Sequence, residues 1–179
     1  QKVLREAKKK AKKNKIKFGV LTFEPVPVMF FNKNIKNHRI NNQRQKIHHL
    51  KKLKLDFLII IKFNKLFSNL SAINFIKKII YKKLNSNFIF VSKNFRFGKN
   101  RVGDINSLIS YEKKYNYKTI ITNPLKKNYK ILSSSILRKK ILNGKIQEVN
   151  KFLGREWSIE GRVIKGKQLG RKIGFPTCN

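Results

Sequence analysis

Apolar positions along the chain switch repeatedly between helical spacing and strand-like runs. Within residues 1–14, apolar side chains recur three or four positions apart among lysines, a spacing that predicts a helix with one buried stripe. Residues 15–23 are rich in β-branched and aromatic side chains and lead into Pro25 and Pro27, which cannot continue a hydrogen-bonded ladder. We therefore expect a strand that ends in a stiff loop.

The same alternation recurs three more times. A helical pattern precedes a short apolar run in each unit: residues 41–53 before 55–63, residues 71–84 before 88–91, and residues 104–115 before 118–122. Ser71 and Asp104 are suited to cap the second and third of these helices. Helices and strands that alternate at lengths suited to crossover connections predict an α/β fold with a doubly wound, mostly parallel sheet.

The pattern changes near the end of the sequence. Helical spacing over residues 134–142 stops at an Asn-Gly pair, and one more short helix is predicted after it. Residues 157–164 then have the spacing of a strand and are followed by a glycine-punctuated loop. This shift in composition predicts a first domain over residues 1–153 and the truncated start of a second domain over residues 154–179.

The charge of the chain allows two interpretations. Lys and Arg number 44 against 8 Asp and Glu, which gives a formal net charge of +36. Such a charge is typical of nucleic-acid-binding proteins. It also arises when drift toward AT-rich codons places lysine and asparagine at exposed positions of a protein with an unrelated function. Because the lysines are spread over every segment, the second interpretation is favoured.

Several classes of protein are excluded by what the sequence contains. No apolar run approaches the roughly 20 residues of a membrane-spanning helix, and no signal peptide is apparent, so we expect a cytoplasmic protein. The single cysteine, Cys178, excludes an internal disulfide framework. The histidines, which lack acidic or thiol partners at ligand spacing, are expected to be solvated. Because the chain starts at Gln1 and stops within a motif at Asn179, we expect it to be a fragment.

The loops that follow the predicted strands are candidate binding sites, because ligands of open parallel sheets bind beyond the carboxyl ends of the strands. After the first strand, Phe23 and Pro25 form a stiff aromatic turn suited to one wall of a flat-ring pocket. After the third strand, Asn94 can pair with the edge of a heterocycle, Phe95 offers an apolar face and Gly98 allows close backbone approach. The alternatives are an ordinary turn in the first case and core packing of the phenylalanines in the second.

A serine-rich helix start is the third candidate. Ser134 and Ser135 stand where a helix N-terminus leaves N–H groups unpaired, an arrangement that binds phosphate readily. Arg138 lies four residues after Ser134 on the same helix face and can reach a phosphate held there. The alternative is that a serine caps the helix and Arg138 is a surface cation.

In order, these segments resemble the bacterial bifunctional riboflavin kinase/FAD synthetase family. Residues 22–27 correspond to its T-F-[DE]-P-H-P motif, residues 94–98 to N-F-x-F-G, and residues 133–138 to S-S-T-x-x-R. Residues 161–179 resemble the opening of its riboflavin kinase module, G-x-V-x-x-G-x-x-x-G-R-x-[LI]-G-F-P-T-x-N. The four motifs occur in the family's order and spacing.

The chain departs from the family pattern at a few positions. Val26 stands where the family commonly has His, Ser135 replaces Thr, and Cys178 replaces Ala. The family's phosphate-binding H-x-G-H motif and the strand before it are expected immediately upstream of Gln1.

The resemblance implies FAD biosynthesis, in which AMP is transferred from ATP to FMN with Mg²⁺ present, in a parent protein that also phosphorylates riboflavin to FMN. The fold implied is a Rossmann-like nucleotidyltransferase domain followed by the truncated start of a β-barrel domain, inactive as a fragment. Catalytic roles at the ATP phosphates fall to Ser134, Ser135 and Arg138, and binding of nucleotide or flavin to Phe23, Pro25, Asn94 and Phe95. In the kinase part the resemblance implies nucleotide binding by Gly166 and Gly170, and by Thr177 and Asn179, which would also hold the metal. A basic nucleic-acid-binding protein and another nucleotidyltransferase of the same superfamily remain alternatives; no specific nucleic-acid or membrane partner is expected.

Overall fold

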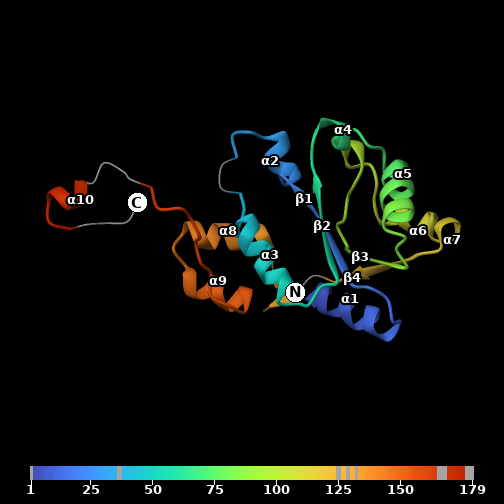
Figure 1. Cartoon of the computed structure of the whole chain (residues 1–179), viewed down its shortest axis with the longest axis horizontal. Helices are drawn as coiled ribbons and strands as arrows, with labels where there is room; N and C mark the ends of the chain where they lie inside the picture. Colours follow the sequence, from blue (N-terminus) through green and yellow to red (C-terminus); the bar gives the residue numbers. More distant parts are fainter. Residues whose placement is uncertain are drawn as a thin grey trace.

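The structure, a computed structural model, describes residues 2–35, 38–123, 126–127, 130–131, 133–164 and 169–175. Figure 1 shows an elongated arrangement, in which the longer strands and α4 to α7 lie toward one end and α8, α9 and the residues after them lie toward the other. The elements in chain order are α1 (Lys2–Lys13), β1 (Gly19–Glu24), α2 (Pro27–Phe31), α3 (Gln43–Lys51), β2 (Phe57–Lys62), α4 (Lys65–Ser68), α5 (Ala72–Asn74), η1 (Phe75–Lys83), β3 (Phe88–Ser92), η2 (Lys99–Arg101), α6 (Ile105–Ser110), α7 (Glu112–Tyr115), β4 (Lys118–Thr122), β5 (Lys126–Lys127), β6 (Lys130–Ile131), α8 (Ser134–Leu142), α9 (Ile146–Leu153) and α10 (Leu169–Lys172).

The four longer strands form two parallel pairs. β1 pairs with β2 from Gly19 opposite Phe57 to Glu24 opposite Lys62, and β3 pairs with β4 from Phe88 opposite Lys118 to Ser92 opposite Thr122. Parallel pairing with helices between successive strands confirms an α/β fold. The expected single sheet is not present among the described residues, where β1–β2 and β3–β4 are separate two-stranded sheets.

An apolar cavity of about 340 Å³ separates the two pairs. Its walls come from α1, β1, η1 and β3, and Phe23 and Phe95 also line it. α1 covers this region with its apolar stripe, and the Lys10 ammonium lies 4.8 Å from the centre of the Phe88 ring on β3. The cavity therefore accounts for the gap in the predicted sheet.

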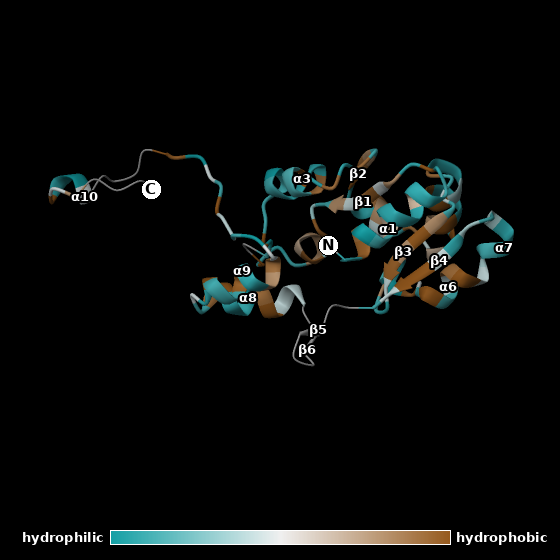
Figure 2. Cartoon of the chain, turned by 90° about the horizontal axis from the view of Figure 1, so that it is seen from below, coloured by the Kyte–Doolittle hydropathy of each residue, from teal (hydrophilic) through white to brown (hydrophobic). Residues whose placement is uncertain are grey.

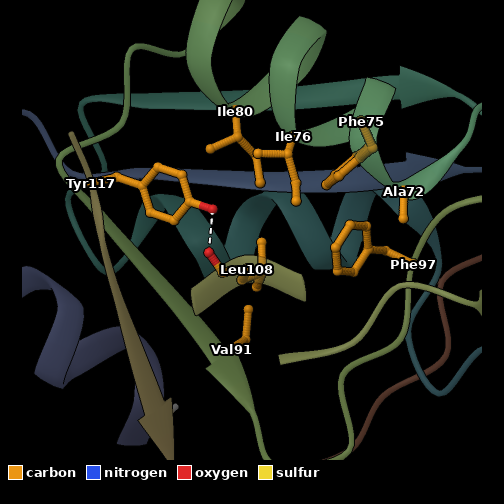
Figure 3. Close-up of a cluster of buried hydrophobic side chains, with 8 residues drawn as sticks. All are labelled: Ala72, Phe75, Ile76, Ile80, Val91, Phe97, Leu108 and Tyr117. Carbon is orange, nitrogen blue, oxygen red and sulfur yellow. Dashed lines mark hydrogen bonds between the residues drawn. The ribbon is translucent and has the colours of Figure 1, made fainter. Parts of the chain in front are cut away.

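The main core lies between β3 and the helical segments α5, η1 and α6. Ile76 and Leu108 are completely buried there, and the Tyr117 hydroxyl donates a 2.5 Å hydrogen bond to the Leu108 carbonyl (Figure 3). In Figure 2, hydrophobic residues concentrate on β3, β4 and α6, whereas α3 and α8 carry more hydrophilic positions. The helix contributed by η1 is π-helical over Phe75–Lys83, a winding that the ordinary 3.6-residue spacing of the sequence did not predict.

Most predicted helix ends are confirmed. Ser71 accepts a hydrogen bond from the Asn74 N–H at 3.2 Å, Asp104 accepts one from the Ser107 N–H at 2.9 Å, and α8 ends just before Asn143 and Gly144. The single helix expected over residues 104–115 is divided into α6 and α7 at Tyr111.

The strand predicted over residues 157–164 is wrong. This segment has no regular secondary structure and forms no ladder with any described strand, so the start of a β-barrel is not confirmed. A strand needs a neighbour to satisfy its backbone groups. Here the Trp157 N–H donates instead to the Asn150 side-chain oxygen at 2.7 Å.

Candidate functional site

The turn after β1 is tied to the segment that leads into α3. Arg39 forms an ion pair with Glu24 that leaves about a quarter of each side chain exposed, and the Lys46 ammonium donates to the Thr22 hydroxyl at 3.1 Å. One carboxylate oxygen of Glu24 and the Arg39 Nε are buried without a hydrogen-bond partner in the part of the chain described. The turn thus presents one acceptor and one donor that the protein itself does not satisfy.

Phe23 and Phe95 face the same apolar cavity, as two walls of a common flat-ring pocket would. The centre of the Phe23 ring lies 5.5 Å from that of Phe67, and Phe95 stacks on Phe97 at 5.4 Å. Both rings also pack against the main core, which agrees with the core-packing alternative for Phe95. Pro25 follows in the turn after a cis peptide bond to Glu24.

Asn94 does not join this pocket. It is exposed in the turn after β3, and no hydrogen bond links it to another described residue. Gly98 does allow a close backbone approach, at φ +75°, but its neighbour is the start of α5 instead of a ligand, since an added Cβ would lie 2.6 Å from the Ala72 nitrogen.

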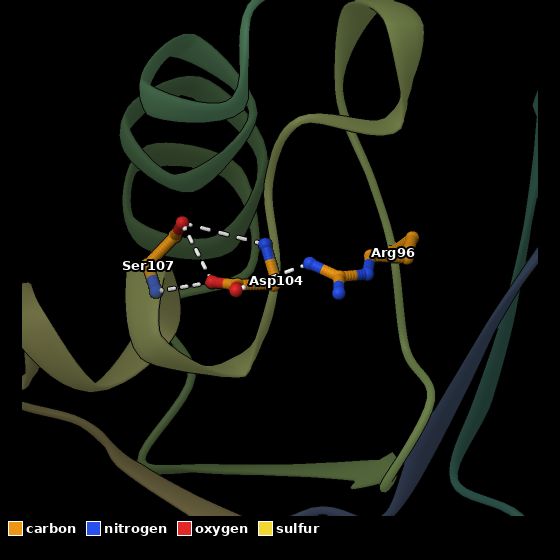
Figure 4. Close-up of polar contacts among 3 residues, drawn as sticks. All are labelled: Arg96, Asp104 and Ser107. Carbon is orange, nitrogen blue, oxygen red and sulfur yellow. Dashed lines mark hydrogen bonds and ion pairs between the residues drawn. The ribbon is translucent and has the colours of Figure 1, made fainter.

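Beyond Gly98 the loop is fixed by the cap of α6. Ser107 and Asp104 exchange hydrogen bonds, and Arg96 reaches the Asp104 carboxylate at 3.1 Å (Figure 4). The Ser107 N–H, followed by the Ser107 hydroxyl and Arg96, holds the pKa of Asp104 below its usual value. This carboxylate therefore has a structural role.

The serine-rich start of α8 contains both a cap and exposed hydroxyls. Ser133 caps the helix by accepting from the Ile136 N–H at 3.3 Å, while Ser134 and Ser135 are exposed. Arg138 donates to the Ser135 hydroxyl at 3.1 Å and to the His38 carbonyl at 3.4 Å. The structure therefore brings Arg138 and Ser135 together, as expected of a phosphate site, and joins them to the segment after α2.

Arg138 lines a second cavity, of about 830 Å³, between α3, α8 and the residues after α9. Arg39 and Arg138 supply positive charge on its lining. Burial, and secondarily Arg138, lowers the pKa of His38, which favours its neutral form. Glu160 adds one carboxylate to the lining. The other residues are polar but uncharged or apolar: Asn42, Gln45, Ser158, Met29, Ile35, Ile40, Ile141, Leu142, Trp157 and Ile159. A cavity with fixed cations and apolar walls suits an anion that carries a flat or apolar group.

The predicted site is thus divided between two cavities. Phe23 and Phe95 line the first and Arg138 lines the second, whereas Asn94 lines neither. Gly170 lies in α10, and Gly166, Thr177 and Asn179 lie outside the described residues. No group of three or more His, Cys, Asp or Glu suited to a metal ion occurs among the residues that the structure describes.

Sequence reasoning missed residues around the second cavity. His38, which lines this cavity, and His49, on α3, are half-buried instead of solvated, and the His49 Nε2 is buried without a partner among the described residues. Gln45 is the one position with a usable signal, because Asn42 followed three residues later by Gln is a capping-box pattern. Trp157 had no such signal, since its partner lies 117 residues away.

Comparison with known proteins identifies the family of this chain. The family model described as FAD synthetase matches residues 1–136, and the one described as riboflavin kinase matches residues 153–179. The chain belongs to the FAD synthetase family. This membership confirms the resemblance drawn from the four sequence motifs.

Relatives of the FAD synthetase family match the whole chain. The bifunctional riboflavin kinase/FMN adenylyltransferase of Buchnera aphidicola subsp. Schizaphis graminum (strain Sg) is 43% identical over 180 residues, which cover 100% of this chain and 58% of that protein. The Escherichia coli (strain K12) protein of the same name is 30% identical, covering 99% of this chain and 56% of its own length. The chain therefore spans a little over half the length of these relatives.

A solved structure has the same fold. A crystal structure titled as a macrolide-efflux protein from Streptococcus pneumoniae matches with a TM-score of 0.81 and 27% identity, covering 99% of this chain and 58% of that one. None of the helices within the described ranges is long and apolar enough to cross a membrane.

Proposed function

We propose that this chain is the adenylyl-transferring part of a bifunctional flavin enzyme. The reaction transfers AMP from ATP to FMN: an oxygen of the FMN phosphate forms a bond to the α-phosphorus, the bond between the α-phosphorus and the bridging oxygen breaks, and pyrophosphate leaves. The observation that carries the proposal is the FAD synthetase match over residues 1–136. We propose that the parent protein also phosphorylates riboflavin to FMN and acts in the cytoplasm.

The second cavity is proposed as the site of the transferring phosphates. Such reactions ask the protein mainly to align the reactants and to stabilise charge on the phosphoryl oxygens. Arg138 is the fixed cation for this role, with Ser134 and Ser135 as hydroxyl donors at the exposed helix start. The unpartnered Nε of Arg39 is a further donor for a phosphate oxygen.

The flavin and nucleotide rings are proposed to contact the turn residues after β1 and β3. Phe23, Pro25 and Phe95 offer apolar surface where β1 and β3 end, and the exposed amide of Asn94 is free to pair with a ring edge.

We propose a boundary between the adenylyl-transferring domain, residues 1–153, and the start of a riboflavin kinase domain, residues 154–179. The match to riboflavin kinase from residue 153 supports it. Within that start, Gly166 and Gly170 would approach nucleotide phosphate and Thr177 and Asn179 would offer oxygen ligands to Mg²⁺. When bound, Mg²⁺ would neutralise charge on the ATP phosphates.

The two strand pairs are proposed to be halves of one doubly wound parallel sheet in the complete gene product. Both β1 and β3 line the apolar cavity that separates the pairs, and the helices α1 and η1 line its other walls. One further apolar strand in this cavity would join the pairs. A crystal structure of the complete protein tests this, because β1 and β3 pairing with the same strand supports the proposal and an empty gap between them would refute it.

The test of function is an assay of the complete gene product for FMN made from riboflavin and ATP and for FAD made from FMN and ATP. Arg138→Ala should lower FAD formation at least tenfold and leave FMN formation unchanged. A fixed positive charge beside the transferring phosphate stabilises the transition state of such reactions by several kcal/mol. Lys139→Ala, at the exposed neighbouring position, serves as the control. Formation of neither product by the unsubstituted protein would refute the proposed function.

A further inference from the structure

Residues 155–160, called the strap here, leave α9 and run back across the N-terminal end of α3. Gly154 ends α9 in the left-handed conformation at φ +66°, which turns the chain toward α3. Five hydrogen bonds then join the strap to residues 40–45, more than 110 positions away in sequence: Arg155 Nη2 to Asn41 Oδ1 at 2.8 Å, Trp157 Nε1 to the Ile40 carbonyl at 2.9 Å, Gln45 Nε2 to the Ser158 carbonyl at 2.8 Å and to the Ser158 hydroxyl at 3.3 Å, and Asn42 Nδ2 to the Glu160 carbonyl at 3.3 Å.

Gln45 is the central fixed point of this contact. Only 4% of the residue is exposed, and its two amide ends have different partners. The oxygen accepts from the Asn42 N–H at 2.9 Å and completes the cap of α3, while the nitrogen donates to Ser158. A buried amide that lost either partner would keep an unsatisfied polar group, which is costly.

The strap is also held at its origin. The Asn150 side-chain oxygen on α9 accepts from the Trp157 N–H at 2.7 Å, and the indole N–H of the same residue donates to Ile40. Trp157 therefore links α9 to the segment before α3 with both of its nitrogen atoms. A link fixed at both ends has little freedom to shift.

Residues 38–42 lie between the strap and Arg138. On one side Arg138 donates to the His38 carbonyl, and on the other the strap holds Ile40, Asn41 and Asn42. The strap residues Trp157, Ser158, Ile159 and Glu160 line the same cavity as Arg138. Yet they fall in the part of the chain that matches riboflavin kinase, from residue 153, and not in the part that matches FAD synthetase.

We propose that Gln45 and Trp157 are positioning residues for adenylyl transfer: by anchoring the strap to residues 40–42, they complete the wall of the cavity and fix the backbone against which Arg138 is aligned. This inference rests on the proposed function. It means that the adenylyl-transferring domain does not build its own site alone, because the first residues of the following domain supply one wall.

The test compares Gln45→Glu with Gln147→Glu. Glutamate at position 45 keeps the oxygen that caps α3 but cannot donate a hydrogen bond to Ser158. Gln147 is exposed on α9, so Gln147→Glu introduces the same charge away from the cavity. In the 179-residue chain, Trp157 is the only tryptophan, so its fluorescence reports the strap directly. Gln45→Glu should shift its emission to longer wavelength and increase quenching by acrylamide, and Gln147→Glu should leave both unchanged.

Activity of the complete gene product supplies the second measurement. Gln45→Glu should lower kcat/KM for FAD formation roughly tenfold, because misplacing a group that aligns the reactants is costly. In an Arg138→Ala background the same substitution should cost less than about twofold, since the residue it positions is gone. FMN formation should not change. A merely structural defect would lower activity equally in both backgrounds.

Trp157→Phe is a second variant that keeps an aromatic ring and removes the indole N–H bonded to Ile40. It should reproduce the loss of kcat/KM and its dependence on Arg138, including if Gln45→Glu proves too unstable to purify. Unchanged kcat/KM in both variants of an active protein, or equal losses with and without Arg138, would overturn the positioning role alone. Absence of FAD formation in the unsubstituted protein would overturn the proposed function instead.

Discussion

Two regions of the molecule are built on different principles. In the packed half, residues 65–122, the chain from α4 to β4 surrounds Ile76 and Leu108, which have no exposed surface. In the cavity half, residues 27–51 and 133–160, only Gln45 and Val149 are buried among the described residues, and segments distant in sequence meet through side-chain hydrogen bonds to carbonyl oxygens. Apolar side chains fill the space around Ile76 and Leu108 in the first half, whereas directional hydrogen bonds hold the second half around a cavity of about 830 Å³.

This difference separates stability from ligand binding. The packed half contains the residues whose loss should unfold the chain, and the cavity half contains the cations proposed to bind phosphate. Substitutions in the packed half should therefore act on the free energy of unfolding, and those in the cavity half on binding, as the following predictions test.

The largest effect is expected at Leu108. Leu108→Ala should lower the free energy of unfolding by about 2–5 kcal/mol, because it leaves a cavity in a completely buried site. The neighbouring Ile109 is 45% exposed, and Ile109→Ala should cost less than about 1 kcal/mol. Urea unfolding followed by far-UV circular dichroism measures both. Similar losses at the two positions would contradict the close packing described for this half.

A slightly smaller effect is expected at Gly98. Gly98→Ala should cost about 3 kcal/mol, because φ +75° and ψ 176° suit only glycine and the new Cβ would meet the Ala72 backbone. Gly144 also has a positive φ, +67°, but nothing lies within 4 Å of an added Cβ, so Gly144→Ala should cost only about 1 kcal/mol. Both variants have a positive φ, so the difference between their urea midpoints reports the steric contact with Ala72. Equal midpoints would show that this contact does not lower the free energy of unfolding.

The same contrast explains how far the sequence could be interpreted. The four strands β1 to β4 and the helix caps at Ser71 and Asp104 depend on continuous apolar runs or on neighbours a few residues away, and the sequence predicted them. The cavity half depends on contacts such as that of Trp157 with the Ile40 carbonyl, for which local spacing carries no signal. Nor could spacing separate the two strand pairs, because it does not specify which strands are adjacent.

The candidate site shows the same limit. Arg138 was predicted to share a helix face with Ser134, four residues before it, and in the structure it donates to the adjacent Ser135 hydroxyl. Asn94 was placed near them only by the general rule for strand ends, and its described position is exposed and apart from both cavities.

A moderate effect is expected at the polar contact inside the packed half. Tyr117→Phe should cost about 1–2 kcal/mol, because it removes the hydroxyl that donates to the buried Leu108 carbonyl. Burial, with a smaller contribution from Glu112, raises the pKa of Tyr117 to about 12, so the donor keeps its proton throughout the neutral range. Tyr81 is 42% exposed, and Tyr81→Phe should change the free energy of unfolding by less than about 0.5 kcal/mol. A Tyr117→Phe variant as stable as Tyr81→Phe would mean that packing alone supports this half.

The smallest effect is a pH dependence confined to the cavity half, where all three histidines of the chain occur, at positions 38, 48 and 49. Burial is the first cause that lowers the pKa of both His38 and His49. The charged groups that act on His49 are Arg155, His48 and Lys52, which lower its pKa further, and Glu160, which opposes them.

Because these pKa values are lower in the folded chain, the unfolded chain binds protons first as the pH falls below about 6.5, and folding stability must decrease there. The carboxylates with lowered pKa, Asp104 and Glu148, begin from values of 3.8 and 4.5 and so stay ionised between pH 7 and 5. Trp157 fluorescence during urea unfolding should therefore show a lower midpoint at pH 5 than at pH 7, and His49→Gln should reduce the difference. The prediction would be contradicted by a urea midpoint that rises on acidification, or by a difference between pH 7 and pH 5 that His49→Gln leaves intact. Burial of His49 would then not lower the free energy of unfolding at acidic pH, and the contrast between the two halves would rest on geometry alone.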